Sequence, residues 1–114
     1  AREADAAPAK PQRIVSLNQC TDQLLLHLVE PERIASLTFL SYEPDATPPR
    51  FRAALAAKPR NHGLAEEVLA LKPDLVVTGA YSGRATTALL RRLGQEVHVF
   101  EPEQRLADMY ANIR

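Results

Sequence analysis

Residues 69–84, LALKPDLVVTGAYSGR, run from the end of a helix through a strand into a loop. Pro73 ends the helix, because proline has no amide N–H to donate and its ring clashes with the preceding turn. Residues 75–78, LVVT, are apolar or β-branched at every position, which is typical of a strand buried between two layers of helices. This succession predicts a parallel α/β sheet, in which ligands bind at the loops that follow the strands.

The same alternation of short apolar runs and amphipathic segments extends over most of the chain. Pro31 ends the first helix, and Gly94 suits the C-terminal cap of a later one. Asn18 or Thr21 is the expected N-cap of the first helix, where Asp22 favours the positive end of the helix dipole. We expect strands at residues 13–17, 33–37, 75–78 and 96–100, a turn or very short strand at 60–63, and helices at 21–29, 51–58, 65–71, 84–93 and from 101 onwards.

These elements predict a Rossmann-like, open and mainly parallel sheet of about four to five strands with helices on both faces. Residues 38–50 contain three prolines and no periodicity, so we expect a loop there. In the helix at 84–93, the predicted apolar side is formed by Ala85, Thr86, Leu89, Leu90 and Leu93.

A chain of 114 residues forms one domain and buries roughly 60–70% of its unfolded surface, so its core requires no metal or disulfide. The 14 basic and 14 acidic side chains give a formal net charge of +0, which disfavours binding to nucleic acid or anionic lipid. A single cysteine, Cys20, rules out an internal disulfide, and no apolar run is long enough to span a bilayer. Residues 1–12 are rich in alanine and proline and are expected to form a flexible leader, as in an exported protein whose signal peptide has been removed.

Several common catalytic motifs are absent from the sequence. The first strand is not followed by G-x-G-x-x-G, no G-x-x-x-x-G-K-[ST] occurs, and residues 79–83, GAYSG, do not match the G-x-S-x-G elbow of hydrolases. His27, His62 and His98 lack the spacing of a zinc site, so no metal site is expected. Cys20 is interpreted as a small, partly buried core residue, with a ligand-facing thiol as the alternative.

The loops after the strands are expected to meet at one edge of the sheet and to carry the binding residues. Tyr42 and Tyr81 each offer an apolar ring and a hydroxyl to a bulky ligand, and Arg84 offers a bidentate guanidinium to a carboxylate or phosphate. The alternatives are tyrosines that only cover the sheet edge and an arginine that is only solvated. The candidate ligand-binding residues are Asn18, Cys20, Thr21, Tyr42, His62, Tyr81 and Arg84.

Three segments follow one another in an informative order: RIVSLNQCTDQLLLHLVEPERIASL (13–37), NHGLAEEVLALKPDLVVTGAYSGR (61–84) and RRLGQEVHVFEP (91–102). Their most specific part is E-x-V-L-A-L-x-P-D-L-V at 66–76. Together they resemble the N-terminal lobe of the class III periplasmic solute-binding proteins. These proteins have two Rossmann-like lobes joined by one long helix, and they deliver cobalamin, ferric siderophores, haem or metal ions to ABC importers.

The resemblance implies a binding protein and not an enzyme, with no catalytic residue and no cofactor. The protein would lie in the periplasm or be tethered to the membrane at its periplasmic face. Residues 13–102 would form the N-terminal lobe, and residues 103–114 the truncated start of the interlobe helix. The implied solute is a corrinoid or an iron chelate such as a siderophore or haem, captured between two lobes and delivered to the permease of the importer.

The resemblance also implies a role for Glu66, which in this family docks against arginines of the membrane permease. Such a charge steers and orients docking more than it adds affinity. The alternative is that Glu66 and Glu67 only complement the dipole of their own helix.

Two other functions are compatible with the sequence. Cys20 would serve as the nucleophile of a thiol-dependent enzyme or of a redox-sensing α/β domain. Alternatively, the chain is a stand-alone interaction domain that dimerises through an apolar stripe in its last helix, formed by Leu106, Met109, Tyr110 and Ile113.

Overall fold

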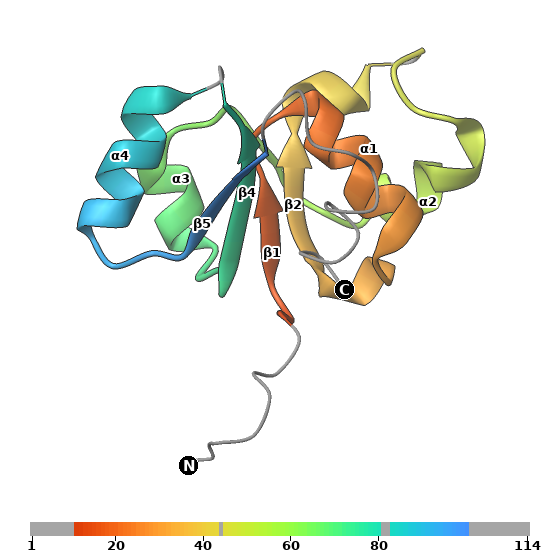
Figure 1. The fold of residues 1–114 in the computed structure, drawn as a ribbon. Coiled ribbons are helices and arrows are strands. Elements are labelled where there is room, and N and C mark those ends of the chain that lie inside the picture. The colour runs from red at the N-terminus through yellow and green to blue at the C-terminus, as the bar shows by residue number, and fades with distance from the viewer. Residues whose placement is uncertain (1–10, 44, 81–82, 101–114) are drawn as a thin grey trace.

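The computed structural model describes residues 11–43, 45–80 and 83–100. Five strands form one sheet in the order β3-β2-β1-β4-β5, and every neighbouring pair is parallel (Figure 1). The predicted α/β class is confirmed, and the short segment after Pro59 is a strand. The strands are β1 (Ile14–Ser16), β2 (Ile34–Thr38), β3 (Arg60–Asn61), β4 (Leu75–Gly79) and β5 (Val97–Phe100).

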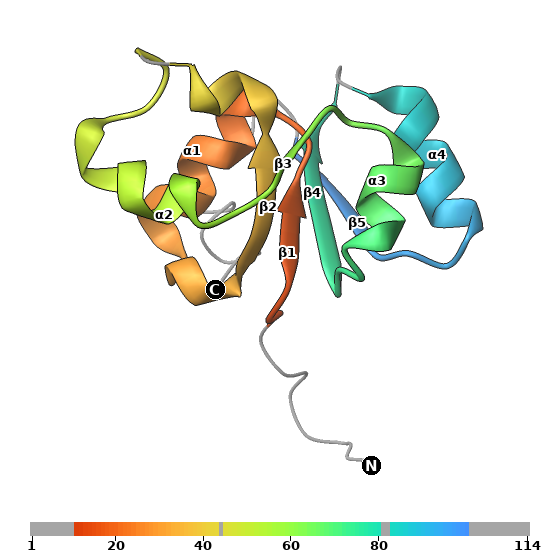
Figure 2. The same ribbon diagram turned by 180° about the vertical axis from the view of Figure 1, so that it is seen from behind.

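Helices cover both faces of the sheet. Figures 1 and 2 show α1 and α2 on one face and α3 and α4 on the other. The segment expected as a loop at 38–50 contains a 3-10 turn directly after β2 and ends in a second one. The helices are α1 (Gln19–Leu28), α2 (Arg52–Ala56), α3 (Ala65–Ala70) and α4 (Arg84–Arg92), and the 3-10 turns are η1 (Pro31–Arg33), η2 (Phe39–Tyr42) and η3 (Pro49–Phe51).

Strand β4 contributes to the core on both faces of the sheet. Val77 packs in the cluster beneath α1, together with Ile14 and Leu25. Val76 packs in the opposite cluster with Leu90 of α4, and both valines are 0% exposed. Burial on both faces explains why this strand reads as a continuous apolar run, as the sequence predicted.

The apolar side predicted for α4 is wrong in part. Leu89 is 41% exposed and Leu93 is 58% exposed, whereas Thr87 and Leu90 face the sheet. Helical spacing alone does not distinguish a stripe that faces the sheet from one that faces a neighbouring helix. Leu89 instead lines a shallow groove between α3 and α4, opposite Leu69.

Two residues of the expected leader, Pro11 and Gln12, make contacts with the domain. The carbonyl oxygen of Pro11 accepts a hydrogen bond from Arg33 Nε at 2.7 Å, and the amide of Gln12 donates to Asp74 Oδ2 at 2.7 Å. None of the helices in the described ranges is long and apolar enough to cross a membrane. Tyr81, the segment 103–114 and the apolar stripe of the last helix lie outside the described residues.

Candidate functional site

The strand order changes direction at β1, which has β2 on one side and β4 on the other. Open α/β sheets bind their ligands at such a point, beyond the carboxyl ends of the strands. Asn18 follows β1 there, and Gly79 is the last residue of β4. A Cβ atom at Gly79 would lie 2.9 Å from Asn18 Nδ2, so the absence of a side chain lets the two loops pack together.

Asn18 and Thr21 build the turn between β1 and α1. Asn18 Oδ1 accepts hydrogen bonds from the amides of Cys20 at 2.7 Å and Thr21 at 3.3 Å, which makes Asn18 the N-cap. Thr21 is 2% exposed, and its hydroxyl lies 2.6 Å from Ser16 Oγ and donates to the Asn18 carbonyl at 2.9 Å. Thr21 therefore supports the turn from inside, contrary to the expectation that its side chain faces a ligand.

Cys20 is exposed in the first turn of α1. The interpretation of Cys20 as a partly buried core residue is wrong, because its neighbours Thr21 and Asp22 occupy the inward side of this turn. The alternative that the sequence left open, a thiol that a ligand can reach, is compatible with this exposure.

Asp22 organises the loop that follows β2. Its carboxylate is 0% exposed and accepts hydrogen bonds from the Thr38 hydroxyl at 2.7 Å and the Ser41 hydroxyl at 2.5 Å. The Thr38 amide also donates to both carboxylate oxygens, at 3.2 and 3.1 Å. Burial raises the pKa of Asp22, and the hydrogen bonds from Ser16, Ser41 and Thr38 offset only part of that rise. The dipole argument had placed Asp22 in the first turn but had not identified this role.

The side chain of Tyr42 makes its contacts within the domain. Its hydroxyl donates to the Lys58 carbonyl at 3.1 Å, and the Arg60 guanidinium lies 4.7 Å from the ring centroid. Burial, followed by the nearby Asp22 charge, raises the pKa of Tyr42 to about 12. The hydroxyl predicted to meet a ligand therefore points to the backbone before β3.

His62 is held in one orientation at the loop after β3. Its Nδ1 lies 3.1 Å from Glu67 Oε2, and its amide donates to Glu67 Oε1 at 2.8 Å. Its ring stacks on Phe39 with centroids 4.8 Å apart and an angle of 27°. Partial burial would raise the pKa of Glu67, but the hydrogen bonds from His62 outweigh it, so the pKa is lowered. The sequence identified His62 as a candidate but neither of its partners, Glu67 and Phe39. Of these, Phe39 is 38% exposed at the predicted edge.

We expect Glu67→Gln to release the imidazole of His62 without unfolding the protein. At neutral pH the carboxylate accepts from Nδ1–H and so favours the tautomer with a bare Nε2, a preference that the amide of glutamine weakens. Long-range ¹H–¹⁵N spectra of the ring report the tautomer directly. The free energy of unfolding should fall by no more than about 1 kcal/mol, since the contact is partly solvated.

Glu66→Gln is the matched control for this change, because Glu66 is the exposed neighbour in the same helix. An unchanged tautomer in Glu67→Gln would show that the carboxylate does not orient the ring. The lowered pKa of Glu67 also determines how stability depends on pH. The contribution of Glu67 to stability is present above the ordinary glutamate pKa and is lost as the pH falls through the lowered pKa.

Arg84 and Glu66 lie on the helices α4 and α3, and both are exposed. Arg84 is the first residue of α4, directly after Gly83, whose φ of 57° favours glycine. Glu66 lines the groove between α3 and α4, where Leu64 is 51% and Leu69 39% exposed. The structure therefore brings Asn18 and Gly79 together at the sheet edge and places Glu66 on the outer helical surface.

No group of three or more histidine, cysteine, aspartate or glutamate residues in the described parts of the chain could hold a metal ion. The exposed apolar side chains at the loop after β2 are Phe39 and Leu40, at 38% and 44% exposure. The described edge offers an aromatic surface with one oriented imidazole, which suits contact with a ligand.

The fold is shared with several solved binding proteins. A possible iron-binding, periplasmic solute-binding protein from Staphylococcus epidermidis is 21% identical with a TM-score of 0.67, and 90% of this chain covers 40% of that one. A periplasmic haem-binding protein from Pseudomonas aeruginosa is 23% identical with a TM-score of 0.66, with coverage of 90% and 36%. The periplasmic vitamin B12 binding protein of Vibrio cholerae is 23% identical with a TM-score of 0.60, with coverage of 81% and 35%.

This chain therefore has the fold of one α/β lobe of a class III periplasmic binding protein, as the sequence resemblance predicted. It spans about 35 to 40% of the length of these three structures. No protein-family model matches the chain, and no curated protein matches its sequence.

Proposed function

We propose that this chain is the N-terminal lobe of a solute-binding protein that serves an ABC importer in the periplasm. The observation that carries the proposal is the exposed edge of the sheet, where the rings of Phe39 and His62 stack, on a fold shared with haem-binding and vitamin B12 binding proteins. The solute lies between this edge and a second lobe. A stiff connecting helix restricts the hinge motion, and the closed protein delivers the solute to the permease.

The chemistry of the edge favours a bulky corrinoid or iron chelate. Phe39 and Leu40 supply exposed apolar surface beside His62, which suits a large, flat ligand. Because Nδ1 of His62 faces Glu67, Nε2 is the ring nitrogen oriented for a metal centre or a polar edge of the solute. Asn18, Cys20 and Arg84 are further proposed contact residues, and so is Tyr81, which lies outside the described residues.

The test is a spectroscopic titration of the protein encoded by the complete reading frame with haemin, cyanocobalamin and a ferric hydroxamate siderophore. We expect one of the three to bind, and His62→Ala to weaken that binding at least about tenfold, which corresponds to 1.4 kcal/mol. His27→Ala is the matched control, because His27 is also exposed but lies on α1, against Phe51. Failure of all three solutes to bind would contradict the proposed ligand class.

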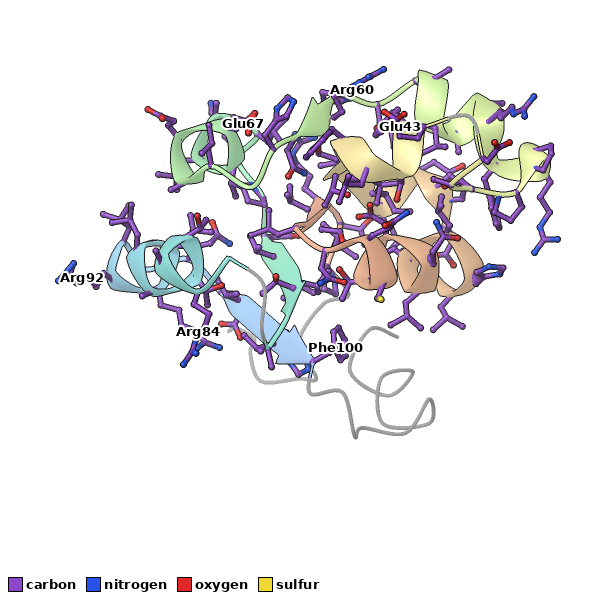
Figure 3. The ribbon with its side chains drawn as sticks, turned by 90° about the horizontal axis from the view of Figure 1, so that it is seen from above. Glu43, Arg60, Glu67, Arg84, Arg92 and Phe100 are labelled. Carbon is purple, nitrogen blue, oxygen red and sulfur yellow. The ribbon has the colours of Figure 1, made fainter. Side chains whose placement is uncertain are left out.

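We further propose that Glu66 docks the lobe on the permease. Glu66 lies in a groove flanked by exposed leucines, so a cation flanked by apolar side chains would complement it. Glu66→Ala should weaken binding of the protein to permease in detergent or nanodiscs at least about tenfold, mainly through slower association, without changing the melting temperature. Glu43→Ala is the control, since Glu43 lies on the opposite side of the domain from α3 (Figure 3). Equal effects of both substitutions would contradict the docking role.

A further inference from the structure

A pocket of about 510 Å³ lies between α4 and β5, away from the stacked rings of Phe39 and His62. Strand β5 is the edge strand of the sheet, so no further strand covers this side within the described chain. The pocket is lined mainly by polar and small residues, which include Arg84, Thr87, Ala88 and Arg91 of α4 and Val97 and His98 of β5.

The four residues of α4 form one face of the helix. They follow the spacing i, i+3, i+4, i+7, which places them on the same side. Arg84 and Arg91 are about 10 Å apart along the helix axis, a distance that two long side chains can close around a small group. Thr87 and Ala88 lie between them and are small enough to leave the space open.

The pocket has an excess of positive charge. Among the described residues, two guanidinium groups line it and no carboxylate does, whereas the chain as a whole carries a formal net charge of +0. Arg91 is held by a hydrogen bond from its Nη2 to the Val97 carbonyl at 3.0 Å. Arg84 makes no hydrogen bond or ion pair within the described residues, and it extends from α4 on the side of β5 (Figure 3). A fixed and a free guanidinium therefore face one space.

Two buried polar atoms at this pocket lack hydrogen-bond partners in the described structure. They are the hydroxyl oxygen of Thr87, a residue 7% exposed, and Nε2 of His98. Both residues line the pocket. A buried polar group without a partner is unfavourable, so a ligand that accepts a hydrogen bond here removes that cost. Burial, and then the Arg91 charge, lowers the pKa of His98, so its imidazole is neutral at neutral pH, and Nε2 donates to an anion in the tautomer that carries the proton on that atom.

We propose that the pocket between α4 and β5 binds an oxyanion, as a free phosphate or as the carboxylate of a small acid. Arg84 and Arg91 bind its oxygens, and the Thr87 hydroxyl donates to it from the pocket floor. Guanidinium groups match the planar geometry of carboxylate and phosphate oxygens. The site lies within one lobe. It shares Gly79 with the candidate edge of the sheet and Arg84 with the residues proposed to contact the solute, whereas Thr87 and Arg91 belong to this pocket alone.

The test is a calorimetric or NMR titration of the 114-residue chain with sodium phosphate and with citrate at low ionic strength. We expect saturable binding of at least one anion, weakened at least about fivefold by Arg84→Gln, as the loss of a charge-assisted contact requires. Arg92→Gln is the matched control, because Arg92 is also an exposed arginine of α4 but lies on the outer side of the helix (Figure 3). It should change the affinity less than about twofold.

Thr87→Val provides a second variant that keeps the shape of the side chain. It should weaken anion binding while leaving the melting temperature unchanged or raised, because it removes a hydroxyl that has no partner. Tighter binding of phosphate would identify a free inorganic anion as the source, and tighter binding of citrate a carboxylate. Absence of saturable binding, or equal losses in Arg84→Gln and Arg92→Gln, would overturn the proposal. That outcome would leave the titrations with haemin and cobalamin unaffected.

Discussion

Asp22→Ala is expected to lower the free energy of unfolding by about 3 kcal/mol, because it removes a buried carboxylate and leaves three donors without an acceptor. These donors are the Thr38 amide, the Thr38 hydroxyl and the Ser41 hydroxyl. All of them belong to the end of β2 and the following turn, so the loss should loosen the loop that carries Phe39. Urea unfolding of both proteins, followed by circular dichroism, measures the difference.

Glu43→Ala is the control for Asp22→Ala. Glu43 follows the same turn but is exposed, so its removal should cost less than about 0.5 kcal/mol. A loss below about 1 kcal/mol in Asp22→Ala would show that the buried carboxylate is not required to hold this loop.

The raised pKa of Asp22 adds a pH dependence with a definite sign. The folded state favours the protonated acid relative to the unfolded state, whose ordinary value is 3.8. This stabilising contribution is complete below that value and is lost as the pH rises through the higher pKa of the folded state. The free energy of unfolding of the native protein should therefore fall, relative to that of Asp22→Asn, as the pH rises through this interval.

These two expectations for Asp22 are consistent with each other. Burial makes the ionised carboxylate costly, yet the donors around it were desolvated at the same time and have no other acceptor within the described residues. A protein that lacks one member of such a cluster is less stable than one that keeps all of them. The cluster thus stabilises one loop conformation at some expense of stability at neutral pH.

The fold was predictable because its signals are local. Pro73, the LVVT run and the glycine-rich loop lie within sixteen residues of sequence, and the strand they predict is buried on both faces. The inward position of Asp22 follows a local pattern as well, since Asp22 shares a buried helical face with Leu25, Leu26 and Val29. Its partners Thr38 and Ser41 were not, because they are 16 and 19 residues away and meet it only across the sheet edge.

The location of the candidate site at one edge of the sheet could be predicted from the sequence, but the part played by each residue could not. The carboxyl ends of parallel strands fixed which loops meet, and these loops do include His62 and Asn18. The direction of each side chain depended on contacts that no local pattern encodes. Tyr42 turns inward to the Lys58 carbonyl, and the Glu67 carboxylate reaches His62 across a turn in which Gly63 has a φ of 77°.

Asn61→Ala is the second substitution with a large expected effect, a loss of about 2 to 3 kcal/mol in the free energy of unfolding. Asn61 is 0% exposed and connects three strands: Nδ2 donates to the Ser16 carbonyl at 3.0 Å and to Ser36 Oγ at 3.1 Å. Its Oδ1 accepts from the Gly63 amide at 3.0 Å and so fixes the turn that presents His62. β3 contains two residues, so side-chain contacts must supply much of its attachment.

Ser36→Ala separates the two roles of Asn61, since it removes one of its hydrogen bonds, along with the Ser36 contact to the Pro59 carbonyl at 2.6 Å, and leaves the Gly63 turn intact. We expect Ser36→Ala to cost about 1 kcal/mol and to leave the His62 ring signals in place. Asn61→Ala should shift those signals and speed hydrogen exchange in β3, because the turn then loses its acceptor. If the two variants were equally stable, with equal His62 spectra, the attachment of β3 would rest on its backbone pairing with Leu37 and Thr38 instead.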